Sequence, residues 1–198
     1  MNPESHALAA VLARRSAKRL DPEKVPTAEQ IEQLLHAAVT VPDHGELRPY
    51  RFVLAQGDAR ARFGDALVES ALERDPALAD GLRAKLRSKA FAAPLQILIV
   101  FAPQVGMKIP LWEQRVTAAC TGYAITLAAS LQGLGAIWKS APSLEGDALR
   151  RLLAMREGEE LLGWVNLGVA LEPPAPRAPV DIQRLAQRLG SAGLEPLS

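Results

Sequence analysis

The stretch that decides the fold is residues 109–140, IPLWEQRVTAACTGYAITLAASLQGLGAIWKS. Its apolar part runs from Val116 to Leu131, which is shorter than the roughly 20 apolar residues that a membrane span needs. We predict a helix buried on most sides, in the core or at a subunit interface, because its alanines, glycine and threonines let another backbone approach closely. Two glycines follow, and GAIWKSA, from Gly135 onward, is expected to be a short strand.

Further elements are expected on both sides of this stretch. Thr27 and Gln30 form a capping box before an apolar pattern of helical spacing, so a helix is predicted there. Other helices are expected at residues 4–15, 58–89 (with a turn near Asp75) and 145–155, and strands at 50–56, 93–103 and 160–172. Strands separated by helices of unequal length indicate a three-layer domain, either α+β or α/β.

The C-terminal end differs in composition. Pro173, Pro174, Pro176 and Pro179 predict an extended linker, and a short polar-faced helix is expected at residues 181–189. We therefore divide the chain into a domain of residues 1–172 and a Pro-rich extension of residues 173–198. An extension of this kind has no core of its own, so it is expected to pack on the domain or on a partner subunit.

Composition excludes some classes of protein. The net charge of +1 argues against a nucleic-acid-binding protein, which would usually present a strongly basic face. Cys120 is the only cysteine, which excludes an intrachain disulfide and fits a reducing compartment. The first residues, MNPESHALAA, do not resemble a signal peptide, so a cytoplasmic location is expected.

The sequence contains no glycine-rich motif that binds nucleotide phosphates and no common motif for nucleophilic catalysis. There is no G-x-G-x-x-G, no P-loop and no G-x-S-x-G elbow, and the three histidines with one cysteine have no metal-ligand spacing. We therefore predict no metal site and no catalytic side chain. If the protein is an enzyme, an organic cofactor is expected to carry the chemistry.

A basic cluster lies near the amino terminus, in the sequence RRSAKR at residues 14–19. Arginines at this point could simply interact with the helix dipole and with solvent. Alternatively, the guanidinium groups and the hydroxyl of Ser16 could bind phosphate oxygens. Because adjacent residues of a helix point apart, Arg14 and Arg15 can bind the same anion only if the helix ends between them or if they contact different parts of the ligand.

Three motifs together resemble the nitroreductase family of FMN-dependent flavoproteins, and in particular its small YdjA-like branch. They are R-R-S-x-x-R at residues 14–19, VPDHGELRPYRFVL at 41–54, and the stretch 109–140. The resemblance covers residues 8–172. It implies a three-layer α-β-α fold of the α+β class with a mainly antiparallel sheet. It also implies an intertwined homodimer with one FMN in each of two clefts between the subunits.

The resemblance implies roles for individual residues. Arg14, Arg15 and Ser16 would hold the FMN phosphate and ribityl end, and Lys18 would lie near the O2 and N1 edge of the flavin. His44 would reach the flavin or its phosphate from the partner subunit, although a loop histidine that caps backbone is the alternative. Trp138, Lys139 and Ser140 would line the cleft, although Trp138 could equally be a core residue.

Two further segments follow from the same resemblance. The NAD(P)H contact would come from Ala128, Ala129, Ser130, Leu131, Gln132 and Gly133. Trp112, Glu113 and Gln114 are expected to start the long helix and to pack at the dimer interface. Arg48 replaces the Gln or Asn of related sequences, so its contact with the flavin is left open.

The implied activity is that of an FMN-dependent NAD(P)H oxidoreductase. Hydride would pass from NAD(P)H through flavin N5 to a nitroaromatic, a quinone or a similar small oxidant. Because one pocket serves both partners, ping-pong kinetics are expected, with no side chain as acid or base. The alternatives are a flavin-binding storage or sensor protein without significant turnover and a dimeric scaffold that has lost flavin.

Overall fold

The computed structural model of the chain describes residues 3–191 and 193–197. One sheet organises the fold. Its strands follow the order β1-β2-β4-β3, and every neighbouring pair is antiparallel. The strands are β1 (Tyr50–Gln56), β2 (Leu95–Phe101), β3 (Gly135–Lys139) and β4 (Glu160–Gly168). The antiparallel pairing confirms the α+β class and excludes the α/β alternative.

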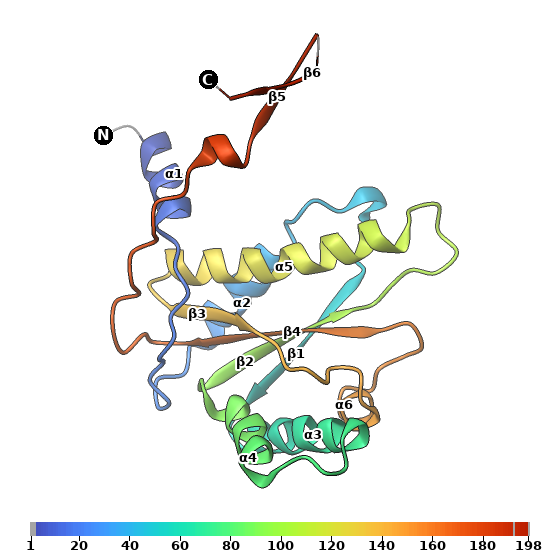
Figure 1. Cartoon of the computed structure of the whole chain (residues 1–198). Coiled ribbons are helices and arrows are strands. Elements are labelled where there is room, and N and C mark those ends of the chain that lie inside the picture. Colours follow the sequence, from blue (N-terminus) through green and yellow to red (C-terminus); the bar gives the residue numbers. More distant parts are fainter. Residues whose placement is uncertain (1–2, 192, 198) are drawn as a thin grey trace.

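Helices cover both faces of this sheet, as Figure 1 shows. On one face lie α2 (Ala28–Ala38) and α5 (Leu111–Leu131), and on the other lie α3 (Ala59–Arg74), α4 (Asp80–Ser88) and α6 (Asp147–Leu152). Strand β2 is buried along its whole length because it packs against helices on both faces. This position explains why its sequence is a continuous apolar run rather than an alternating one.

The predicted helix ends are largely confirmed. The side chain of Thr27 accepts from Gln30 N at 3.1 Å, and Thr27 N donates to the side chain of Gln30 at 2.9 Å, which is the predicted capping box. The break near Asp75 separates α3 from α4. The first helix, α1 (Pro3–Ala13), ends two residues earlier than predicted, so the arginines that follow lie outside it.

Helix α5 was predicted to be buried on most sides, in the core or at a subunit interface, and within one chain it is buried on one side. Its inner face is buried against the sheet and α2, with Ala118, Ile125 and Ala129 fully buried. Its outer face leaves a row of large apolar side chains at least half exposed, namely Trp112, Val116, Tyr123 and Leu131. The small residues of α5 therefore allow close packing on one side, while the other side presents apolar surface. No helix within residues 3–191 and 193–197 combines the length and apolar composition required to cross a membrane.

The C-terminal extension corrects one prediction. Instead of a helix over residues 181–189, the chain forms a single 3-10 turn at Ile182–Arg184 and then a hairpin of β5 (Gln187–Gly190) and β6 (Gly193–Pro196). Gly190 ends β5 and Gly193 begins β6. Gly193 takes a φ of 138°, which glycine adopts more readily than other residues, and this favours the hairpin. Figure 1 shows this hairpin and α1 projecting from the same end of the molecule.

Candidate functional site

The basic segment begins directly after α1. Arg14 and Arg15 follow the last helical residue, Ala13. Helix geometry therefore does not force their two side chains to point apart. The Arg15 guanidinium Nη1 donates to Leu12 O at 2.6 Å and to Arg14 O at 2.9 Å. Its Nε is buried and has no hydrogen-bond partner among the described residues. A buried donor without an acceptor is unfavourable, so this nitrogen is suited to an anion that the chain itself does not supply.

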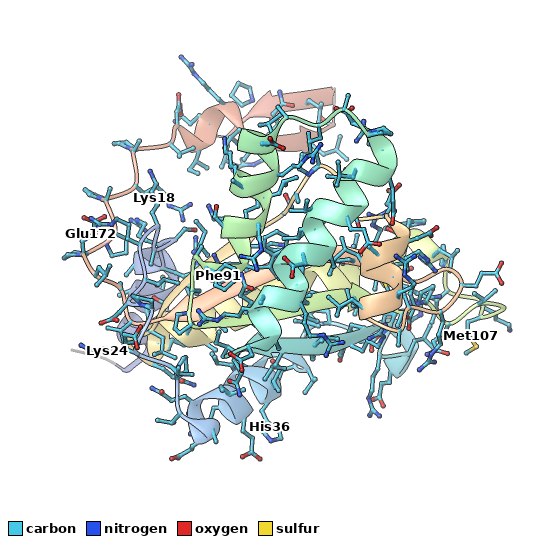
Figure 2. The ribbon with its side chains drawn as sticks, turned by 90° about the horizontal axis from the view of Figure 1, so that it is seen from below. Lys18, Lys24, His36, Phe91, Met107 and Glu172 are labelled. Carbon is cyan, nitrogen blue, oxygen red and sulfur yellow. The ribbon has the colours of Figure 1, made fainter. Side chains whose placement is uncertain are left out.

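Backbone contacts attach this segment to the sheet. Ala17 N donates to Ala136 O near the start of β3 at 3.0 Å, and Leu20 forms an isolated bridge with Ala170 just after β4. Gly135 makes the approach possible, because a Cβ there would lie 3.0 Å from the Cβ of Ala17. The first and third predicted motifs therefore meet at β3, an edge strand of the sheet. Lys18 and Ser16 are exposed on this segment, and Figure 2 shows Lys18 on the same side of the molecule as Glu172.

Trp138 lies two residues beyond Ala136 on β3. It is half-buried, and its ring packs directly against Gly122 of α5, where a Cβ would overlap the indole. Gly163 of β4 lies against the indole nitrogen. Trp138 is thus partly a core residue, as the alternative interpretation required. Lys139 and Ser140 follow it and are exposed.

Lys89 is a residue of this site that sequence reasoning missed. Its Nζ donates to Ser140 O at 2.8 Å. Burial, and then the charges of Lys139 and Lys85, lower the pKa of the Lys89 ammonium. Two cationic side chains therefore gather where β3 ends. A negatively charged group beside these two lysines would stabilise their protonated forms.

The position of Lys89 depends on a buried polar contact. Gln96, which is fully buried on β2, donates from Nε2 to Lys89 O and to Asn166 Oδ1, both at 2.9 Å. Asn166 lies on the neighbouring strand β4, directly opposite Gln96 in the strand register. No sequence motif marks Lys89. The side-chain amide of Gln96, in an otherwise apolar strand, was nevertheless a signal, because a buried amide needs polar groups beside it as hydrogen-bond partners.

The other predicted residue, His44, lies elsewhere in the chain. Its Nδ1 is 2.8 Å from Glu113 Oε1 in the first turn of α5. Trp138 packs against Gly122, nine residues further along the same helix, so the two contacts are separated by about 13 Å along the helix axis. Within one chain, His44 and Trp138 therefore contact different parts of α5. The predicted origin of His44 in a partner subunit stays a prediction.

The segment predicted to contact NAD(P)H forms the end of α5 and the turn after it. Ala129 is fully buried in the core, whereas Leu131 and Gly133 are exposed, and Ala128, Ser130 and Gln132 are half-buried. Gln132 Nε2 donates to Gln33 Oε1 at 3.1 Å. Any nucleotide contact would thus come from the last residues of the segment.

Gln114 corrects a smaller prediction. It was expected to pack at the dimer interface with its neighbours, but it is 2% exposed. Its side chain accepts from Gln104 N at 2.8 Å and donates to Ile109 O at 2.9 Å. Trp112, by contrast, is among the exposed residues of α5.

An open cleft of about 970 Å³ begins at Ala141, directly after the site residues of β3. Its ionised side chains are mostly satisfied within the chain. Arg115 pairs with Glu160 at 2.8 Å, and Glu73 accepts from Asp147 N and Ala148 N at the start of α6. None of the predicted site residues lines this cleft. In the part of the chain that the structure describes, no group of three or more His, Cys, Asp or Glu residues is suited to hold a metal ion.

Comparison with known proteins gives consistent results. The family model described as "Nitroreductase family" matches residues 11–169. A curated relative from Escherichia coli K12, named "Putative NAD(P)H nitroreductase YdjA", is 36% identical over 162 residues, covering 82% of this chain and 87% of the relative.

Solved structures share the fold. A nitroreductase-like family protein from Bacillus cereus matches with a TM-score of 0.77 at 22% identity, over 94% of this chain and 97% of that one. An iodotyrosine deiodinase bound to FMN and 3-iodo-L-tyrosine matches with a TM-score of 0.64 at 18% identity, over 88% of this chain and 94% of the other.

Proposed function

The chain belongs to the nitroreductase family and is an NAD(P)H-dependent oxidoreductase, and on this premise we propose that FMN is its cofactor. We propose that hydride passes from NAD(P)H to a nitroaromatic, a quinone or a similar small oxidant by a ping-pong mechanism. The observation that carries the proposal is the pair of cationic groups attached to one sheet edge. Arg14 and Arg15 lie near Ala136, while Lys89 and Lys139 lie at the end of β3.

The spacing of these groups fits an elongated ligand. Ala136 and Ser140 are four residues apart, or roughly 13 Å along an extended strand. FMN has a dianionic phosphate at one end and a flat ring system at the other. The buried Arg15 Nε lacks an acceptor, and a phosphate oxygen would supply one. Ser16 and Lys18 lie on the same segment.

At the other end, the chain's own residues would tune the ring. When bound, FMN supplies a ring that accepts and donates hydride. Lys89 and Lys139 would stabilise negative charge there, and a lysine that is partly desolvated interacts more strongly with such charge than a solvated one. Trp138 packs on the α5 face of the sheet through its contact with Gly122, whereas Lys89 lies over the ring of Trp164, which belongs to the core on the other face.

We propose that the protein is a homodimer. The exposed apolar row on α5 is the first reason, because extended apolar surface of this kind marks interaction sites. The exposed apolar residues of α1 and of the C-terminal extension are the second: Leu8, Val11, Leu12, Val180, Ile182, Leu185, Leu189 and Leu194. The extension would pack on the second copy, and the loop of His44 would reach the partner's flavin. NAD(P)H would contact the end of the segment 128–133.

The test compares flavin uptake in three proteins: the wild type, Arg14→Ala/Arg15→Ala and the control Arg62→Ala. Arg62 is an exposed arginine of α3, outside the basic segment 14–19. The proposal expects a yellow wild type that bleaches with anaerobic NADH or NADPH. It also expects at least about 100-fold weaker FMN binding in the double variant, because each charge-assisted hydrogen bond contributes about 1.5–3 kcal/mol.

Two results would contradict the proposal. A wild type that takes up no FMN would refute it, and equal FMN affinity in the double variant and in Arg62→Ala would remove the role of the arginine pair. A wild type that binds FMN but is bleached by neither nucleotide would favour the flavin-binding protein without turnover.

A further inference from the structure

The loop that carries His44 is fastened to the start of α5. Glu113 Oε1 lies 2.8 Å from His44 Nδ1, and Thr117 Oγ1 donates to Pro42 O at 3.2 Å. Gly45 lies so close to Ile109 that a Cβ would come within 2.6 Å of the isoleucine Cδ1. Ile109 is itself fixed, since its carbonyl accepts from the buried Gln114.

The backbone of this loop has an uncommon conformation. Gly45, Glu46 and Arg48 have φ values of 74°, 52° and 48°, in the left-handed region that non-glycine residues seldom adopt. Asp43 Oδ2 accepts from Arg48 N at 2.7 Å and closes the turn. Residues in such conformations persist where the surrounding contacts determine them. The position of His44 is therefore fixed by the fold rather than left to a flexible loop.

The contact with Glu113 also decides which nitrogen of His44 is available. An ionised carboxylate can only accept hydrogen bonds, so Nδ1 must carry the hydrogen whether the ring is neutral or protonated. Nε2 is then the one ring nitrogen left for a ligand, as acceptor in the neutral ring and as donor in the protonated ring. The side chain of His44 is 67% exposed while that of Glu113 is 33% exposed, so the pair presents the imidazole outward.

We propose that Glu113 is a positioning residue that holds His44 through Nδ1, so that Nε2 contacts the flavin. The proposal rests on the proposed function, because it takes the ligand to be FMN in the cleft shared with a second copy of the chain. It also gives a role to a residue that the sequence placed at the start of the long helix and at the dimer interface. At metal sites, a carboxylate that accepts from one ring nitrogen of a histidine fixes the tautomer and the orientation of the ring for the nitrogen that binds the metal.

A second histidine–glutamate pair provides a matched control. On α2, His36 Nε2 lies 3.7 Å from Glu32 Oε1, and both side chains are more than 70% exposed. Figure 2 shows His36 projecting away from the body of the molecule. Glu32→Gln therefore removes a carboxylate from a histidine without touching the loop of His44.

The experiment records the ¹⁵N resonances of the histidines with and without FMN, and the dissociation constant of FMN. The chain has three histidines, so the spectra are simple to assign. The proteins are the wild type, Glu113→Gln, Glu113→Ala and Glu32→Gln. We expect Nδ1–H at His44 in the wild type, a shift of its Nε2 on adding FMN, and loss of the fixed tautomer in both Glu113 variants. FMN binding should weaken about 5- to 20-fold in those variants and stay unchanged in Glu32→Gln.

The possible failures are distinguishable. If the wild type takes up no FMN, the proposed function fails and this inference fails with it. If FMN binds but His44 Nε2 does not respond, or if Glu113→Gln keeps both the tautomer and the wild-type affinity, the inference alone is overturned. Glu113→Gln is nearly isosteric, so its result stands even if Glu113→Ala does not fold.

Discussion

Gly122 offers a direct test of how the site is built onto the fold. This glycine lies inside α5, and its Cα faces the six-membered ring of Trp138. A Cβ there would overlap three ring carbons, so the Gly122→Ala change requires the indole to move. Trp138 has little room on its other side, because a Cβ on Gly163 would already lie 2.7 Å from its Nε1.

The magnitude follows from two opposing effects. Replacing a helical glycine with alanine gains up to about 1 kcal/mol through helix propensity, whereas forcing extra volume into a packed site costs about 1–3 kcal/mol. Gly81 isolates the first effect, because it lies in α4 and a Cβ there meets nothing within 4 Å. We expect Gly122→Ala to be about 1–3 kcal/mol less stable than Gly81→Ala, which corresponds to roughly 2–10 °C in Tm.

The assay is thermal unfolding of the wild type and both variants at one saturating FMN concentration, so that ligand stabilisation is comparable. Tryptophan fluorescence provides a second readout, because the displaced indole changes its environment. The reasoning is refuted if Gly122→Ala is as stable as Gly81→Ala or if its fluorescence matches that of the wild type. Either result would mean that Trp138 is not fixed by α5.

Two further predictions concern charges near the sheet. Hydrogen bonds from Arg51 lower the pKa of the buried Glu159 carboxyl, so this pair stabilises the protein above the unfolded pKa and loses its effect as pH falls through the lower folded value. Glu159→Gln should lower the free energy of unfolding at pH 7, measured in urea, by about 2–4 kcal/mol. The stability of this variant should also depend less on pH between about 5 and 3 than that of the wild type. An equally steep loss of stability in acid would contradict the prediction. Lys89→Met should weaken FMN binding about 10- to 100-fold, measured by fluorescence titration, with little change in unfolding of the flavin-free protein; equal affinity would remove Lys89 from the site.

The sequence predicted the elements whose local signals are strong. Thr27 with Gln30 marked a helix start correctly, because both partners of a capping box lie in one turn. The strand around Ile97 was found because its sequence is an apolar run, in which Gln96 is the one polar residue. The hairpin at residues 187–196 was missed, because a short segment with polar and apolar residues satisfies a helical pattern as well as a strand pattern.

The site was harder to predict because its parts are distant in sequence. The arginine pair was predicted through its motif, and the structure ends α1 at Ala13, directly before the pair; phosphate binding by the pair stays a prediction. Lys89 could not be found in this way, since it reaches Ser140 only because Gln96 fixes its carbonyl from a neighbouring strand. Glu113 was recognised as part of a motif, but its contact with His44 spans 69 positions and depends on the fold.

The arrangement within one chain also bears on the proposed homodimer. His44 is held at the first turn of α5. Trp138 of β3 packs against Gly122, nine residues further along this helix, and the arginine segment contacts β3 at Ala136, two residues before Trp138. Thr117 and Glu113 attach the loop of His44 to the start of α5. If both groups serve one flavin, they must come from different subunits, and the exposed apolar face of α5 is the surface on which those subunits would meet.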